Sequence, residues 1–260
     1  IGKCYFCRLE LLLIMAEEVE ITNDELSKPA IGSDSYTEDE ITTLTWNEHI
    51  RRRPGMYIGK LGDGTSSDDG IYVLLKEVLD NAIDEYMMGY GKQVSIDINE
   101  QSVQVRDFGR GIPLEKVVDV ASKMNTGAKY DSKAFKKSVG LNGVGIKAVN
   151  ALSTEFYIES VRDGQCKQAH FSRGEIISES DIIPSNEPNG TLVRFTPDAE
   201  IFRGYKYLEE FIIPLLKNYT FLNTGLAIYL NGKRFYSRNG LMDLLKENLT
   251  AEVLYPIIHL

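Results

Sequence analysis

The segment Lys76-Glu-Val-Leu-Asp-Asn-Ala-Ile-Asp-Glu85 predicts one amphipathic helix with an unusual polar side. At helical pitch Glu77, Asn81 and Asp84 share one stripe, and the opposite side is apolar enough to pack against a sheet. A solvated stripe normally carries lysine or arginine among its acids, and this stripe has neither. The stripe could therefore place a general base beside a ligand for a hard metal ion. For the helix taken alone, an ordinary acidic surface is the alternative.

Two glycine motifs follow this helix. Asp107-Phe-Gly-Arg-Gly111 ends a predicted strand, where its glycines let the backbone approach a flat ligand and its carboxylate can accept a hydrogen bond, for example from an adenine amino group. A plain turn is the alternative. Gly140-Leu-Asn-Gly-Val-Gly145 opens a predicted helix, and its free backbone N–H groups suit a polyphosphate. Its spacing, and the lack of a hydrophobic strand before it, argue against a dinucleotide-binding fold.

The remaining sequence predicts a mixture of helices and strands. Helices are expected at about 45–50, 71–88, 114–124, 146–152, 205–219 and 239–248. Strands are expected at about 94–98, 103–105, 155–162, 166–172 and 191–196, in a hairpin turning at Asn231-Gly232, and at 253–258. Residues 125–139 form a polar, lysine-rich connection of a length that is often functional.

The negative charge of the chain is concentrated in one segment. The net charge is −9, but residues 15–40 hold nine acidic residues and one lysine, and residues 41–260 carry only −2. We expect residues 15–40 to be mobile in isolation, and the remainder lacks the basic footprint of a protein that grips nucleic acid by charge. No apolar run approaches the roughly 20 residues of a membrane span. Three cysteines fit a reducing compartment, and Cys4-x-x-Cys7 alone is weak evidence for a metal or redox site, with an unstructured leader as the alternative.

Taken in order, the motifs resemble those of the GHKL ATPases, the superfamily of type II topoisomerase B subunits, Hsp90 chaperones, MutL repair proteins and histidine kinases. The pattern Glu77-x-x-x-Asn81-x-x-Asp84, Asp107-x-Gly-x-Gly111 and Gly140-x-x-Gly-x-Gly145 carries this resemblance. With Arg53-Pro-Gly-Met-Tyr-Ile-Gly59, it looks like the bacterial gyrase and topoisomerase IV B subunits over about residues 36–260. Asn142, where gyrase subunits commonly have histidine, favours topoisomerase IV.

The resemblance implies an α/β (α+β) two-layer sandwich, in which helices cover one face of a mixed, mostly antiparallel sheet. It divides the chain into a flexible acidic leader and arm (1–40), an ATPase domain (41–245) and the start of a truncated transducer domain (246–260). It also implies a role for individual residues. Glu77 would be the general base, Asn81 the Mg²⁺ ligand, and Asp107 the acceptor of the adenine amino hydrogen bond, supported by Thr191.

The remaining site residues implied by the resemblance fall into four groups. The pocket would be lined by Asp84, Gly109, Gly111 and Ile112. The phosphates would be wrapped by Gly140, Leu141, Asn142, Gly143, Val144, Gly145 and Ile146, with Lys129 and Lys136 as cationic contacts. The rim would be formed by Glu85, Arg110, Pro113 and Arg162, with Glu85 and Arg110 forming an ion pair at the mouth of the pocket. Tyr36, on the arm, would contact the nucleotide of the partner subunit.

The function implied is that of the ATP-binding and ATP-hydrolysing domain of a cytoplasmic type II DNA topoisomerase B subunit. ATP and Mg²⁺ would be its cofactors, and ATP-site inhibitors would bind the same pocket. ATP would drive homodimer closure through the arm, and the full-length protein would act on DNA with an A subunit, as A2B2. Residues 1–260 alone would hydrolyse ATP feebly and would not cleave DNA. The alternatives are a gyrase B subunit, an Hsp90-like or MutL-like clamp, and a nucleotide-binding module without hydrolysis.

Overall fold

The computed structural model describes residues 43–126 and 143–249. The chain divides into two compact units, 1–43 and 44–260, and the first lies almost entirely outside the described residues. Several residues and one element of the predicted site and fold also lie outside them: Tyr36, Lys129, Lys136, Gly140, Leu141, Asn142 and the strand expected at 253–258. In the described ranges, no helix is long and apolar enough to cross a membrane.

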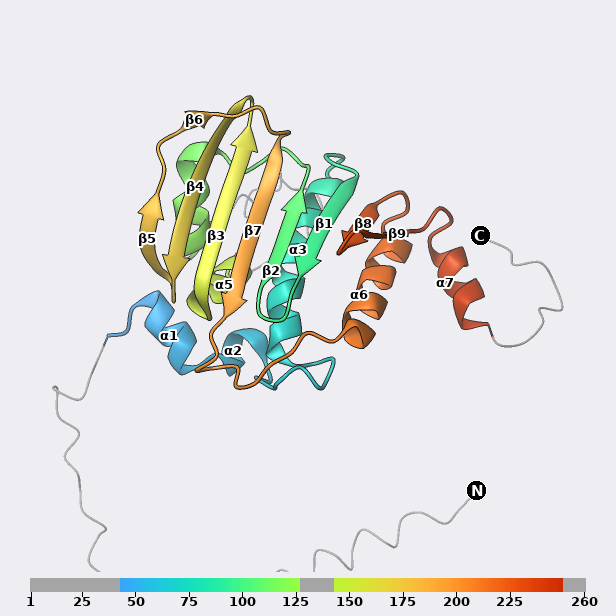
Figure 1. The fold of residues 1–260 in the computed structure, drawn as a ribbon, viewed down its shortest axis with the longest axis horizontal. Coiled ribbons are helices and arrows are strands. Elements are labelled where there is room, and N and C mark those ends of the chain that lie inside the picture. The colour runs from blue at the N-terminus through green and yellow to red at the C-terminus, as the bar shows by residue number, and fades with distance from the viewer. Residues whose placement is uncertain (1–42, 127–142, 250–260) are drawn as a thin grey trace, which may run out of the picture. The chain divides into compact units, whose positions relative to one another are not determined.

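The described residues contain a nine-stranded sheet (Figure 1). Its strands are β1 (Gln93–Ile98), β2 (Val103–Asp107), β3 (Ser153–Arg162), β4 (Gln165–Ser172), β5 (Glu175–Glu179), β6 (Ile183–Pro184), β7 (Gly190–Pro197), β8 (Ala227–Leu230) and β9 (Lys233–Tyr236). Their order is β5-β4-β3-β7-β2-β1-β8-β9, with β6 beside β4. The β1–β8 pair is parallel and the other pairs are antiparallel, which confirms the expected mixed, mostly antiparallel sheet.

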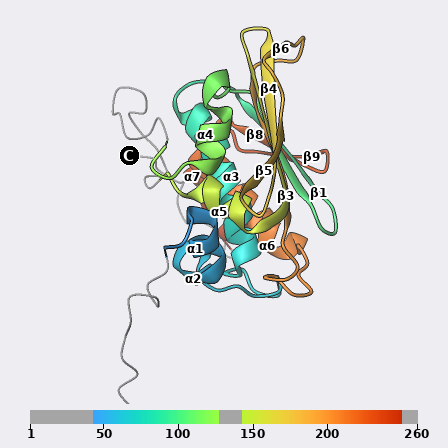
Figure 2. The ribbon, with the colours of Figure 1, turned by 90° about the vertical axis from the view of Figure 1, so that its left-hand side faces the viewer.

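Helices cover one face of this sheet. The described helices are α1 (Trp46–Arg52), α2 (Gly55–Ile58), α3 (Gly70–Met87), the 3-10 helix η3 (Leu114–Lys116), α4 (Val117–Ser122), α5 (Gly145–Ala151), α6 (Glu209–Leu222) and α7 (Leu241–Asn248). Figure 2 shows α3, α4 and α5 side by side against the same side of the sheet. The expected two-layer arrangement is therefore present.

The core follows the alternation of side chains along the strands. Ile96, Val105, Val193, Ile158 and Ala169 are register partners across β1, β2, β7, β3 and β4, and all are buried. Because side chains alternate between the faces of a sheet, every second residue along each strand lies on the same face as this row. The helices supply the other half of the core, which fixes α3 and α5 above the central strands.

Helix α3 has a defined beginning and end. The Asp69 carboxylate, at its N-cap, accepts hydrogen bonds from the backbone N–H groups of Gly64 (2.9 Å) and Ser66 (3.1 Å), which shapes the preceding loop. At the other end Gly89 has φ of +90°, the left-handed conformation that terminates helices and that glycine adopts without a steric cost. The helix thus ends where the sequence pattern predicts it.

Helix α5 is short and is held at its C-terminal end. Arg51 of α1 donates a hydrogen bond to the carbonyl of Ala151 (3.0 Å) and forms an ion pair with buried Asp198 (2.7 Å). A helix leaves its last carbonyl groups without partners in the helix, so the Arg51 guanidinium satisfies one of them. This contact ties α1 to α5.

Some elements differ from their predicted boundaries. The helix expected at 205–219 begins only at Glu209, because Phe202, Tyr205 and Tyr207 pack edge-to-face with one another and with Tyr72 in an irregular segment. The helix expected at 114–124 opens as η3 and ends at Ser122. The sequence pattern did not predict α2, β5 or β6.

Candidate functional site

The polar stripe of α3 faces inward. Asp84 is fully buried and Glu77 and Asn81 are half-buried. The side-chain amide of Asn81 donates a hydrogen bond from Nδ2 to the Glu77 carbonyl (2.9 Å), which orients the amide on the helix. Burial of an acid on this stripe is not what an ordinary solvated acidic surface shows, because an ionised carboxylate is costly to remove from water. The stripe is therefore part of an internal site.

Asp107 ends β2 with its carboxyl group buried. Both of its hydrogen bonds end on Oδ1, from the backbone N–H groups of Gly109 (2.8 Å) and Thr191 (3.2 Å). Among the described residues Oδ2 accepts no hydrogen bond, so it is the oxygen that a ligand could use. Burial raises the pKa of Asp107 to about 6, although the two N–H donors act in the opposite direction. Thr191 supports Asp107 through its backbone.

The motif after Asp107 packs against α3. A Cβ added to Gly109 would lie 2.8 Å from the Cβ of Glu85, closer than Cβ atoms normally approach, so only glycine fits this contact. The Glu85 carboxylate accepts hydrogen bonds from the Arg110 backbone N–H (3.1 Å), from Nε (3.0 Å) and from a terminal guanidinium nitrogen (2.9 Å). The Arg110 guanidinium also lies over the Tyr90 ring, 4.4 Å from its centroid. The structure thus joins Glu85 and Arg110, as predicted.

The other end of the same motif packs against β3. Gly111 has φ of +76°, and a Cβ there would overlap the Val161 carbonyl oxygen. Ser160 donates its hydroxyl to the Ile112 carbonyl (2.8 Å), and a guanidinium nitrogen of Arg162 lies 3.5 Å from the Gly111 carbonyl. These contacts fix the direction of the chain as it leaves the sheet. Pro113 is exposed and precedes η3.

Glu77 lies directly against the third motif. Gly145 is the first residue of α5, and a Cβ added to it would overlap Oε2 of Glu77. Gly143 and Val144 immediately precede the helix, and Ile146 is buried behind it. The structure therefore brings an acidic side chain of α3 to the beginning of a glycine-bounded helix, where backbone N–H groups are available to a ligand.

Two side chains near this site were not singled out from the sequence. Lys147 is buried on α5, and its Nζ donates hydrogen bonds to the carbonyls of Thr126 and Gly143, both at 2.6 Å. Asp80 is buried on α3, where it accepts hydrogen bonds from the Tyr219 hydroxyl and from Lys76 (2.6 Å). A lysine inside the mostly apolar run Gly145-Ile-Lys-Ala-Val-Asn-Ala-Leu152 was the available signal for Lys147.

The described residues contain no group of three or more His, Cys, Asp or Glu side chains that could enclose a metal ion. Mg²⁺ at phosphate sites is commonly bound by only one or two protein oxygens, and substrate phosphates and water supply its other ligands. The described residues are compatible with a site of that kind. Asn81 has the right chemistry for such a ligand. Its Nδ2 donates to the helix backbone, and the side-chain atom that would bind the metal is the amide oxygen, because an amide nitrogen is a donor only.

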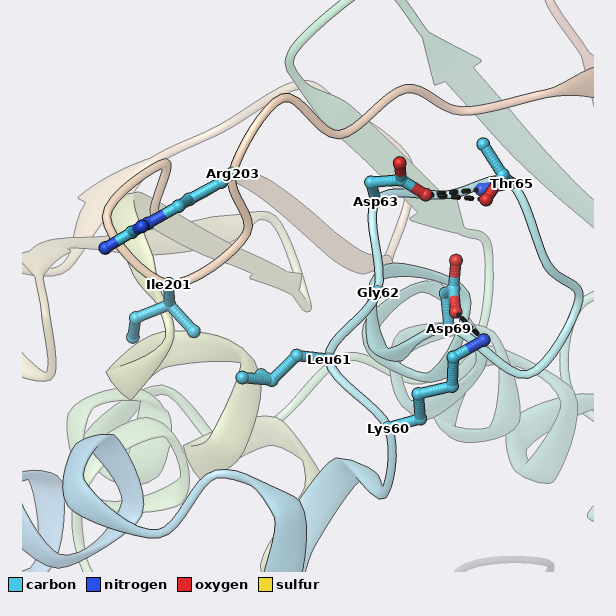
Figure 3. A pocket seen from close by; sticks show the side chains of 8 residues that line it. All are labelled: Lys60, Leu61, Gly62, Asp63, Thr65, Asp69, Ile201 and Arg203. Carbon is cyan, nitrogen blue, oxygen red and sulfur yellow. Dashed lines mark hydrogen bonds and ion pairs between the residues drawn. The ribbon is translucent and has the colours of Figure 1, made fainter.

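A cavity of about 410 Å³ lies elsewhere, at the N-terminal end of α3 (Figure 3). It is lined by Lys60, Leu61, Gly62, Asp63, Thr65, Asp69, Ile201 and Arg203. Its polar groups are largely engaged with one another, since Lys60 pairs with Asp69 (2.8 Å) and Asp63 accepts the Thr65 hydroxyl (2.7 Å). Glu77 is eight residues further along the helix, roughly 12 Å at 1.5 Å per residue. We therefore place the candidate site at the motifs and not at this cavity.

The three motifs lie within a region that matches a known protein family. Residues 66–201 match the family described as histidine kinase-, DNA gyrase B-, and HSP90-like ATPase. The chain is 50% identical over 226 residues to the B subunit of DNA topoisomerase 4 from Borreliella burgdorferi, which covers 86% of this chain and 38% of that protein. It is 37% identical over 224 residues to the B subunit of DNA gyrase from Mycolicibacterium smegmatis, covering 83% and 32%. The chain thus spans about a third of the length of these relatives.

A solved structure resembles the fold as a whole. It is the crystal structure of the 43K ATPase domain of Thermus thermophilus gyrase B in complex with an aminocoumarin. The match has a TM-score of 0.68 and 30% sequence identity, and it covers 82% of this chain and 57% of that one. The similarity therefore extends over most of the sheet and the helices, beyond the motifs themselves.

Proposed function

The chain belongs to the histidine kinase-, DNA gyrase B- and HSP90-like ATPase family, and on that premise we propose that it is the ATP-binding and ATP-hydrolysing domain of a type II DNA topoisomerase B subunit. The contact of Glu77 with Gly145 carries the proposal. It puts a carboxylate that could accept a proton beside a backbone segment whose N–H groups could bind phosphate. A base that activates water for attack on a terminal phosphate has to lie next to the groups that hold that phosphate.

In this proposal the phosphates lie along the entry to α5. The backbone N–H groups of Gly143, Val144, Gly145 and Ile146, at the beginning of α5, would bind them there, as helix-opening glycine segments do in other phosphate sites. Glu77 would accept a proton from the attacking water, and its position on the rigid helix α3 holds the carboxylate in place for that transfer. Mg²⁺, held by the Asn81 oxygen, would offset the charge that develops on the phosphates.

The adenine would lie at the other end of the site. Asp107 Oδ2 is the acceptor for the adenine amino group, and the N–H groups of Gly109 and Thr191 hold the carboxylate in place. Gly111 and Ile112 continue the wall of this end, with Asp84 behind it. The Glu85–Arg110 ion pair, Pro113 and Arg162 would form the rim. Lys129, Lys136 and Gly140 to Asn142 remain proposed phosphate contacts outside the described residues.

We also infer the setting in which the domain works. A topoisomerase IV B subunit is favoured over a gyrase B subunit, since the identity to the Borreliella topoisomerase 4 protein is 50% and that to the Mycolicibacterium gyrase protein is 37%. The full-length protein would act in the cytoplasm on DNA as A2B2 with an A subunit. ATP would favour a closed homodimer, in which the segment 1–40 and its Tyr36 reach the partner subunit.

Removal of the Glu77 carboxylate tests the proposal. In the full-length protein, Glu77→Ala should leave the dissociation constant for ATP within about threefold in calorimetry, because the base is needed for proton transfer and not for binding. Turnover should fall by roughly 10²-fold or more in a phosphate-release assay, the usual loss when a general base is removed. Glu115→Ala, at an exposed position on η3, is the matched control and should change neither quantity.

The result also separates the remaining alternatives. Unchanged turnover in Glu77→Ala would remove Glu77 from the role of base. ATP binding without any turnover in the parent protein would favour the nucleotide-binding module without hydrolysis. Absence of ATP binding in the parent protein would contradict the proposal as a whole.

A further inference from the structure

Lys147 is the third residue of α5 and its side chain is 1% exposed. Its ammonium group donates one hydrogen bond to the Thr126 carbonyl and one to the Gly143 carbonyl, both 2.6 Å long. Bonds this short, with a charged donor, are stronger than those between neutral groups. A buried lysine that bonds two backbone carbonyls therefore holds the chain in place at this position.

The two carbonyls belong to the residues that bound segment 127–142. Because each oxygen lies 2.6 Å from the same nitrogen, the two oxygens can be no more than about 5.2 Å apart, twice the bond length. One side chain therefore fixes the separation of the points where the chain leaves the α4 region and where it returns to α5.

The same bonds set the position of Gly145. Gly143 lies four residues before Lys147, so its bond to Nζ closes the turn that leads into α5, and Gly145 lies within that turn. Gly145 in turn packs against the Glu77 carboxylate without room for a Cβ. A small displacement of this turn would move the backbone N–H groups relative to Glu77.

A second side chain of α5 also bonds the chain that runs from α4 to Thr126. Asn150, one turn after Lys147, is fully buried and donates Nδ2 to the carbonyl of Ala121 in α4 (3.0 Å). Lys147 and Asn150 thus both bond backbone carbonyls of the chain that runs from α4 to Thr126. The position of α5 against this chain is consequently fixed at two points, and of these two side chains only Lys147 also holds the glycine turn.

We propose that Lys147 is a positioning residue for the phosphate end of the site. Its ammonium holds the glycine turn at Gly143–Gly145 at a fixed position relative to Glu77. The N–H groups of the turn and the Glu77 carboxylate can then contact the same phosphate. The inference rests on the proposed function. It assigns to Lys147 a role in phosphate binding that is exerted through the backbone.

The test compares two probes that share the adenine and differ in the phosphates. Lys147→Met keeps the length and apolar stem of the side chain and removes its donors. We expect it to weaken binding of the non-hydrolysable ATP analogue AMPPNP at least tenfold, and binding of adenosine less than twofold, both measured by calorimetry with competition for the weak ligand. Lys123→Met, which removes an exposed lysine paired with Asp119 on α4, is the control and should change neither affinity.

Each other outcome counts against the inference. A parallel loss for AMPPNP and adenosine would show that Lys147 only supports the fold, and no loss for either would show that the turn holds without it. If Lys147→Met fails to fold in thermal melts, Lys147→Gln, which keeps an N–H donor at shorter reach, replaces it. The loss of affinity for AMPPNP is again compared with that for adenosine. If Lys147→Gln also fails to fold, Lys147 only supports the fold. A parent protein that binds neither probe would instead contradict the proposed function.

Discussion

The carboxyl group of Asp107 is buried in the native protein, and this burial raises its pKa to about 6 from an ordinary value of 3.8. A carboxyl group whose pKa is higher in the folded state binds its proton more tightly there. Its contribution to stability is therefore fully present below pH 3.8 and is lost as the pH rises through about 6. At neutral pH an ionised Asp107 destabilises the native state by about 3 kcal/mol at most.

Asp107→Asn should consequently separate stability from binding. At pH 7.5 we expect the free energy of unfolding to rise by about 1–3 kcal/mol, because the amide is neutral and its oxygen can keep the two N–H donors. Affinity for ATP should fall by roughly 1–3 kcal/mol, because a charged acceptor for the adenine amino group is lost.

Urea unfolding at several pH values, with calorimetry at pH 7.5, measures both effects. The difference in stability between the variant and the parent protein should shrink as the pH falls from about 7 to 4. The parent protein's own affinity for ATP should weaken over the same range, as Asp107 takes up a proton. A constant stability difference between pH 4 and 7 would contradict the raised pKa, and an unchanged dissociation constant would contradict the adenine contact.

Residue roles were predictable from the sequence where a motif carries them. Asp107 was identified because its motif occurs in order with the two others, and the ion pair of Glu85 with Arg110 was expected and is present. Lys147 and Asp80 were not identified. Lys147 bonds the Thr126 carbonyl, 21 residues away, and Asp80 accepts a hydrogen bond from Tyr219, 139 residues away. The sequence shows a lysine in a mostly apolar run but does not show which distant groups it meets.

At the scale of elements, the meeting of α3 with α5 determines the geometry of the site. Helix α3 was predictable from its apolar period, its polar stripe and the glycine after it. The hairpin of β1 and β2 followed from alternation. The beginning of α6 was predicted too early, because tertiary packing of Phe202, Tyr205 and Tyr207 overrides their local helical pattern. The fully exposed strand β5 has no buried face and so gave no alternating signal.

Gly145→Ala tests the contact between these two helices. Gly145 is the first residue of α5, where alanine would ordinarily be favoured over glycine, so any loss comes from the collision of the new Cβ with the Glu77 carboxylate. We expect turnover of ATP to fall by about 10²-fold or more, since a shift of about 1 Å in a catalytic group has that effect. The free energy of unfolding should fall by about 1–3 kcal/mol, the usual result of overpacking.

Gly55→Ala is the matched control. Gly55 is also the first residue of a helix, α2, and nothing lies within 4 Å of a Cβ added there. It should leave turnover unchanged and stability equal or slightly higher. Equal turnover in Gly145→Ala and the parent protein, measured by phosphate release, would mean that Glu77 and the start of α5 do not need their present separation.

At the scale of the whole molecule, the distribution of charge bears on what the domain does with DNA. Residues 41–260 carry a net charge of only −2, and the acidic segment 15–40 carries −8. A domain of this kind has little electrostatic attraction for the phosphate backbone, because nonspecific binding depends on clustered lysine and arginine. If the proposed function holds, contact with DNA would depend on residues outside 41–260, and ATP would act on it indirectly through the conformation of the proposed dimer.

The full-length protein should accordingly couple ATP to strand passage only as an assembly. Together with an A subunit and Mg²⁺, it should decatenate linked DNA circles in an ATP-dependent manner, as read by gel electrophoresis. This expectation follows from the identity to the Borreliella topoisomerase 4 B subunit, which is higher than that to the Mycolicibacterium gyrase B subunit. The full-length protein alone should hydrolyse ATP without changing DNA topology, and Glu77→Ala should abolish ATP-dependent decatenation by the assembly while Glu115→Ala does not. Introduction of negative supercoils instead would identify a gyrase, and ATP turnover without any topological change in the assembly would favour an Hsp90-like or MutL-like clamp.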